Sequence, residues 1–259
     1  MAAQRFPDRE RSDMRKGMVD VATPDGVADS YLVVPDGGGP GVLLFMDAFG
    51  LRPRIEEMAD AIAARGFAVL APNLLYRGGR APQFDLADLG DPDKRGALFG
   101  QIMPLIGALT PAAIAADAGA YIDFLTAQDG VEAGPVVITG YCMGGKNALL
   151  AIEALPSRVK AIASFHGGRL ATDQPDSPHL SVGKITGEVY FGHADHDHSM
   201  DADQIKLLEN ALDEAGVTYT SEVYEGAEHG YTMTDTAAYQ EAGERRHWEN
   251  LFALLERTR

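Results

Sequence analysis

The chain has a single cysteine, in the pentapeptide Gly140-Tyr141-Cys142-Met143-Gly144. An apolar run precedes this G-x-C-x-G pattern, and a helix-like stretch follows it. Between a strand and a helix, such a pattern is typical of a sharp turn that lifts its central side chain above the sheet edge. The N-terminus of the following helix favours negative charge, and hence a thiolate over a thiol. The pattern predicts a nucleophilic cysteine; the alternative is a buried structural cysteine beside glycines that a tight turn requires.

A nucleophile of this kind needs a general base, and the base needs a carboxylate that orients it. His229 lies in EGAEHGYTM, just past the last predicted strand and in a glycine-bounded loop, which makes it the strongest candidate for the base. The segment FGHADHDHSMDADQ follows the preceding strand and offers two acids, Asp195 and Asp197. Asp195 fits a short turn counted from Gly192. Asp197 fits better when the register is set from Met200, and we prefer Asp197.

The HADHDH run within that segment also suggests a metal site, because histidine and aspartate are ligands for zinc and similar ions. It lacks the spaced His-x-x-x-His of a helical zinc site, and consecutive side chains in a short loop point in divergent directions. We therefore expect no metal and no other cofactor. A metal-dependent hydrolase that uses this loop is kept as an alternative.

Strand-like and helix-like segments alternate along the chain. A hairpin is predicted over residues 18–35, and residues 73–110 are expected to form a loop with a short helix. The other predicted strands are 41–46, 67–72, 135–141, 159–165, 187–194 and 218–225, and the predicted helices are 54–65, 111–128, 144–155, 203–215 and 237–256. This alternation predicts one α/β domain over residues 1–259, with a mostly parallel sheet covered on both faces and residues 1–16 as an extension. In such sheets, chemistry collects at the carboxyl ends of the strands.

Composition limits the classes of partner. A content of 46% apolar and 23% charged residues suits a soluble globular domain, and a net charge of −16 argues against nucleic acid and anionic lipid. No apolar stretch approaches the roughly 18 residues of a membrane span, and the charged N-terminus has no signal-peptide core. One cysteine allows no internal disulfide. We expect a cytoplasmic enzyme with a small-molecule substrate and no nucleic-acid or membrane partner, either a monomer or a dimer.

Four motifs carry a family resemblance: GYCMGG around the cysteine, LLFMDAFGLRP, APNLLYRGG and EGAEHGYTM. With them, the chain from about Met18 to its last helix resembles the dienelactone hydrolase (carboxymethylenebutenolidase) family of the α/β-hydrolase fold. The resemblance implies a triad of Cys142, His229 and Asp197 that cleaves an ester or lactone through an acyl-thioester. It also implies an oxyanion hole formed by the backbone N–H groups of Met143 and Ala48.

The chain departs from that family at two places. Asp47 stands where well-known members carry a glutamate that helps to form the thiolate; it is either thiol-activating or a turn residue. Those members also bind a substrate carboxylate with two arginines. One maps to Arg77, which is either a pocket or a surface residue, and the other position holds Met233. His166 follows another strand and has no assigned role.

A non-catalytic ligand-binding protein with the same fold is the second alternative to the hydrolase.

Overall fold

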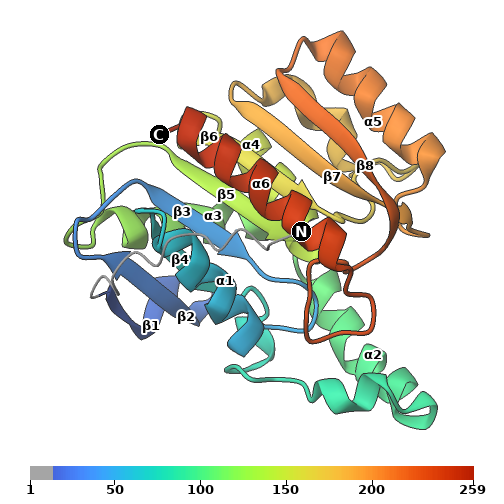
Figure 1. Ribbon diagram of the computed structural model, residues 1–259, viewed down its shortest axis with the longest axis horizontal. Coiled ribbons are helices and arrows are strands. Elements are labelled where there is room, and N and C mark those ends of the chain that lie inside the picture. The colour runs from blue at the N-terminus through green and yellow to red at the C-terminus, as the bar shows by residue number, and fades with distance from the viewer. Residues whose placement is uncertain (1–13) are drawn as a thin grey trace, which may run out of the picture.

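A computed structural model describes residues 14–259, which fold around one eight-stranded sheet (Figure 1). The strand order is β1-β2-β4-β3-β5-β6-β7-β8; β3 to β8 are parallel, whereas β1 and β2 are antiparallel to their neighbours. The strands are β1 (Met14–Thr23), β2 (Gly26–Pro35), β3 (Gly41–Phe45), β4 (Ala68–Pro72), β5 (Val136–Tyr141), β6 (Val159–Phe165), β7 (Glu188–His196) and β8 (Tyr219–Glu228). The predicted α/β class and mostly parallel sheet are confirmed.

Helices cover both faces of the sheet. They are α1 (Pro53–Ala63), α2 (Pro92–Gly107), α3 (Pro111–Thr126), α4 (Met143–Ala154), α5 (Ala202–Ala215) and α6 (Glu241–Arg257), with short 3₁₀ turns η1 (Tyr76–Gly78), η2 (Leu86–Leu89) and η3 (Pro178–Lys184). Helices α1 and α6 lie together in front of the sheet in Figure 1, and Arg65, in the turn after α1, stacks on Phe252 of α6. Helices α3 and α4 pack together on the opposite face.

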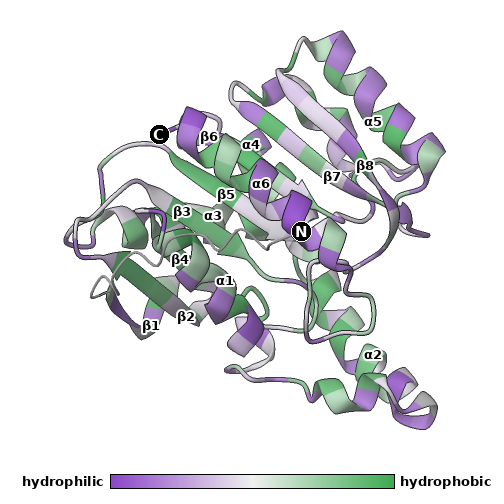
Figure 2. Ribbon diagram, in the orientation of Figure 1, coloured by the Kyte–Doolittle hydropathy of each residue, from purple (hydrophilic) through white to green (hydrophobic). Residues whose placement is uncertain are grey.

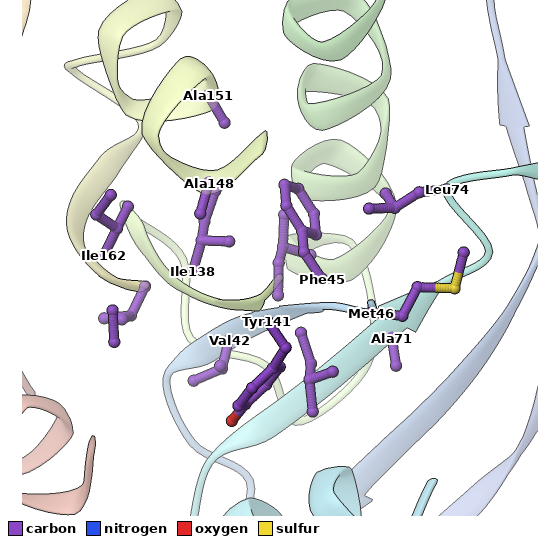
Figure 3. Close-up of a cluster of buried hydrophobic side chains, with 14 of the residues drawn as sticks. Val42, Phe45, Met46, Ala71, Leu74, Ile138, Tyr141, Ala148, Ala151 and Ile162 are labelled. Carbon is purple, nitrogen blue, oxygen red and sulfur yellow. The ribbon is translucent and has the colours of Figure 1, made fainter. Parts of the chain in front are cut away.

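The core explains why the central strands are so uniformly apolar. Figure 2 shows hydrophobic residues along β3, β4 and β5, and polar residues on the outer sides of α5 and α6. Every residue of β3 and β5 is buried, as expected of parallel strands with helices on both faces. Figure 3 shows side chains of these strands packed with the α4 residues Ala148 and Ala151. This packing gives α4 a rigid base directly after the cysteine turn.

Two sequence predictions need correction. Residues 14–16 belong to β1 rather than to an extension; the rest of the predicted extension, residues 1–13, lies outside the described residues. The expected short helix within residues 73–110 is the 16-residue helix α2. Asp91 caps its first turn, but the interior Pro104 and the glycines of this helix obscured its pattern in the sequence. The other predicted elements agree with the structure to within a few residues at their ends.

No single helix among residues 14–259 is long and apolar enough to cross a membrane; α2 and α3 pass that test only as a pair bent by 81°.

Candidate active site

Cys142 occupies a strained turn between β5 and α4. Its backbone has φ 54° and ψ −115°, a conformation that is costly for a residue other than glycine. Two neighbouring glycines make the turn sterically feasible. A Cβ on Gly140 would lie 2.1 Å from the carbonyl oxygen of Gly144, and a Cβ on Gly144 would lie 2.2 Å from that of Phe45. The glycines thus let α4 begin directly against the ends of β5 and β3.

The thiol of Cys142 meets the imidazole of His229. Its Sγ lies 2.9 Å from Nε2 of His229, which comes immediately after β8. On the other side of the ring, Nδ1 of His229 donates to Oδ2 of Asp197 at 2.6 Å. The three side chains come from three different strand ends, as the parallel topology predicts. They form a continuous path from thiol to carboxylate.

Asp197, and not Asp195, is the carboxylate that reaches the histidine. Asp195 accepts a hydrogen bond from the backbone N–H of Gly226 at 2.9 Å, on the β8 side of the loop. The carboxyl of Asp197 is almost fully buried, and its Oδ1 accepts from both the backbone N–H and the hydroxyl of Ser199, at 2.8 and 2.6 Å. Ser199 therefore fixes one carboxylate oxygen while the other faces His229.

Electrostatics in this group favour a charged imidazole. Burial alone would lower the pKa of His229, but its electrostatic interaction with Cys142 and its hydrogen bonds to Asp197 and Cys142 outweigh burial and raise that pKa to about 10. Burial opposes ionisation of Asp197, but the His229 and Ser199 contacts prevail and its pKa falls below the usual value. Each partner thus stabilises the charge of the next.

Two backbone N–H groups near the cysteine turn have no hydrogen-bond acceptor among the described residues. Among the hydrogen bonds of residues 14–259, none is donated by the backbone N–H of Met143 or of Ala48. Met143 begins α4, so its N–H has no partner within the helix. Ala48 lies in the turn after β3, whose end is in close contact with Gly144. These are the two groups that the family resemblance implies for an oxyanion hole.

Asp47 is engaged with an arginine. Its two oxygens accept from Nη1 and Nη2 of Arg52 at 2.7 and 2.9 Å, and Oδ1 also accepts from the backbone N–H of Phe49. Arg52 in turn donates to Asp235 and to the carbonyl of Gly50, so all five of its N–H groups have partners. These contacts fit the turn-residue alternative for Asp47. They fix the backbone on either side of Ala48.

Arg77 forms ion pairs with two other carboxylates. Its guanidinium donates to the buried carboxylate of Asp117 on α3 and to Asp25 in the β1–β2 turn. The ring of Tyr76 lies beneath it at 4.5 Å. None of the hydrogen bonds and ion pairs of the described chain joins Arg77 to Cys142, His229 or Asp197. Met233, at the second predicted cation position, is buried in the core.

The HADHDH loop disperses its side chains. His193 is buried and stacks on Phe191 at 5.6 Å, whereas His196 and His198 are exposed and Asp195 turns toward β8. Within residues 14–259, no three histidine, cysteine, aspartate or glutamate side chains gather as ligands for a metal ion.

Sequence reasoning missed Ser199 and Arg52 and gave no role to His166. Ser199 could have been found, because an aspartate carboxylate often accepts a hydrogen bond from the backbone N–H two residues further along the chain. Arg52 and Asp47 are only five residues apart and carry opposite charges, so their ion pair could have been predicted from the sequence. The contacts of His166 with His229 and Thr232 join segments that are distant in the sequence, and no local sequence pattern predicts them.

An eight-stranded, mostly parallel sheet with a strained strand–turn–helix connection at Cys142 after β5 defines an α/β-hydrolase fold. Residues 28–258 match the model of the dienelactone hydrolase family, and the chain belongs to that family. The predicted family and fold are thereby confirmed. The chain is a dienelactone hydrolase-like hydrolase.

Individual relatives agree with this assignment. A Synechocystis protein named "Putative carboxymethylenebutenolidase" is 25% identical over 94% of this chain and 97% of its own. The crystal structure of a "Putative Dienelactone Hydrolase" from Klebsiella pneumoniae has a TM-score of 0.80 at 23% identity, and covers 93% of this chain and 98% of its own. The dienelactone hydrolase-like promiscuous phosphotriesterase P91, from metagenomic libraries, has a TM-score of 0.76 at 25% identity over 94% of this chain and 98% of its own.

Proposed function

We propose that this hydrolase cleaves carboxylic esters or lactones with Cys142 as its nucleophile, His229 as its base and Asp197 as the orienting carboxylate. The observation that carries the proposal is the unbroken series of contacts from Sγ of Cys142 through both nitrogens of His229 to Asp197. A thiol, an imidazole and a carboxylate in this order form the arrangement that activates a nucleophile.

The reaction proceeds in two stages. In the first, His229 Nε2 holds the thiol proton while Sγ attacks the carbonyl carbon, and the oxyanion that forms accepts from the N–H groups of Met143 and Ala48. Collapse breaks the bond to the leaving oxygen, which takes the proton from His229, and leaves an acyl-thioester on Cys142. In the second stage, His229 removes a proton from water, which attacks the thioester and releases the acid. Asp197 stabilises the imidazolium in both stages.

The contacts of Arg77 limit the substrate proposal. Because its guanidinium is bound to Asp25 and Asp117, and Met233 occupies the second expected cation position, we propose that the substrate needs no carboxylate for binding at these two places. Simple uncharged esters and lactones therefore belong to the expected substrate class. A cytoplasmic location is part of the same proposal, because a reducing compartment keeps the single thiol free.

Turnover of p-nitrophenyl acetate and of dienelactones by the wild type and Cys142→Ala tests the function. Activity that disappears in the variant, that iodoacetamide abolishes and that a chelator leaves intact supports the proposal. Activity that a chelator removes and that survives in Cys142→Ala favours the metal-dependent alternative. If the folded wild type turns over neither ester nor lactone, and its thiol reactivity does not depend on His229, the result favours a ligand-binding protein.

A further inference from the structure

A second histidine lies directly behind the imidazole of His229. The ring of His166 meets the ring of His229 edge to face, with centroids 5.4 Å apart and an angle of 66° between the planes. His166 is fully buried, and its Nε2 is hydrogen-bonded to Oγ1 of Thr232 at 2.8 Å. We propose that His166 is a positioning residue that holds the His229 ring and the loop carrying it in the reactive orientation; this inference rests on the proposed function.

His166 is one of several anchors of the loop after β8; the Tyr231 hydroxyl, for example, donates to the carbonyl of Gly192 at 3.1 Å. Thr232 is fully buried, and its carbonyl accepts from Nη2 of Arg54 at 2.7 Å. Tyr231 packs edge to face on His166 with ring centroids 5.1 Å apart. His166 thus contacts His229, Tyr231 and Thr232, three residues within one short segment. Without it, the ring of His229 would lose this edge-to-face contact.

The backbone of His166 is strained, and the strain is confined to this edge of the sheet. His166 has φ 40°, and the other non-glycine residues with positive φ among residues 14–259 are Cys142 and Arg169. Such a conformation is costly for a residue other than glycine and persists only where the surrounding contacts impose it. His166 follows β6 directly, and its N–H donates to the carbonyl of Gly192 on β7. The strained turn therefore brings a side chain from the sheet edge into contact with the catalytic loop.

The charge of His166 also suits this role. Burial, assisted by the nearby His229 and His247, lowers the pKa of His166 well below its ordinary value, so its ring is neutral. A neutral ring supports His229 without opposing the positive charge that forms there. A lysine or arginine at the same place would repel the imidazolium and weaken the thiolate beside it.

The test measures the pH dependence of Cys142 alkylation by iodoacetamide together with kcat and KM for p-nitrophenyl acetate. Thr232→Val keeps the volume of Thr232 and removes its hydroxyl, and His166→Asn keeps a residue that tolerates positive φ. In both variants we expect kcat to fall about tenfold or more, KM to stay within about twofold, and the alkylation midpoint to rise. Thr232→Ser, which retains the hydroxyl, should keep near wild-type values.

His247→Gln is the matched control. His247 is also fully buried, and its Nε2 is hydrogen-bonded to Tyr141. None of the hydrogen bonds or ring contacts of the described chain joins His247 to His229, so its loss should lower Tm without moving the alkylation midpoint. Folded Thr232→Val and His166→Asn proteins with wild-type kcat and alkylation profiles would overturn the inference. If alkylation of the wild-type thiol does not depend on His229, the proposed function itself fails, whatever the His166 variants do.

Discussion

Asp197 binds Nδ1 of His229 at 2.6 Å, whereas Asp195, two residues earlier, binds the backbone N–H of Gly226. The two acids are therefore a natural pair for mutagenesis. Asp197→Asn should lower kcat by about 10²- to 10⁴-fold, because the imidazole loses the charge that stabilises its protonated form and sets its tautomer. Asp195→Asn should stay within a few-fold of the wild type. Equal losses in steady-state ester hydrolysis by the two variants would contradict the assignment.

Asp47 separates a thiol-activating role from a structural one. We expect Asp47→Ala to release Arg52 and the Phe49 N–H, to disturb the turn that holds the Ala48 N–H, and to lower kcat by about 10- to 100-fold. The pH profile of Cys142 alkylation should remain unchanged, since both carboxylate oxygens already face Arg52. A large upward shift of that profile would instead restore the thiol-activating role.

Arg77 should affect stability more than activity. Arg77→Gln leaves the buried carboxylate of Asp117 without its cation, and we expect a loss of about 3–5 kcal/mol in the free energy of unfolding. KM for a carboxylate-bearing lactone should not change. Arg80→Gln, which removes an exposed ion pair with Asp20, is the control and should leave Tm almost unaltered. A raised KM in a stable Arg77→Gln protein would mean that this arginine binds substrate.

Glu153 on α4 predicts a pH-dependent stability. Its side chain is 5% exposed, Oε1 has no hydrogen-bond partner in the described chain, and burial, only partly offset by Lys184, raises its pKa from 4.5 to about 8. Between these values the native state binds more protons than the unfolded state, so stability falls as pH rises toward 8.

Glu153→Gln should therefore match the wild type below pH 4.5 and exceed it above pH 8 by up to about 5 kcal/mol. Urea unfolding across this range measures the difference, and Glu214→Gln, an exposed glutamate on α5, should show no such trend. A constant difference between Glu153→Gln and the wild type at all pH values would show that this carboxyl does not titrate as described.

Local patterns predicted the parts of the fold that local physics determines. The apolar runs of β3 and β5, and the glycines that flank Cys142, follow from burial on both faces and from a turn that excludes Cβ atoms. Together, these two patterns predict that Cys142 lies in a turn at the end of a central strand. His229 is predicted as the general base because it follows the last strand, and parallel strands end at the same edge of the sheet.

Long-range pairings were beyond the reach of the sequence. Asp117 lies 40 residues after Arg77, and no local pattern indicates that α3 presents a buried carboxylate to that guanidinium. Helix α2 was underestimated because its glycines and Pro104 weaken helix propensity, and because Phe99 and Met103 remain exposed on it. Patterns of burial cannot identify a helix that buries so little.

The acyl group on the enzyme is the most direct evidence to seek. Wild-type protein mixed with p-nitrophenyl butyrate, quenched in acid within the first turnover and digested, should carry one butyryl group on the peptide that contains Cys142. Hydroxylamine should remove that group, as it does from a thioester, and Cys142→Ala should neither acquire it nor turn over the ester. An acyl group on another residue, or ester turnover by Cys142→Ala at the wild-type rate, would contradict the assignment of Cys142 as the nucleophile.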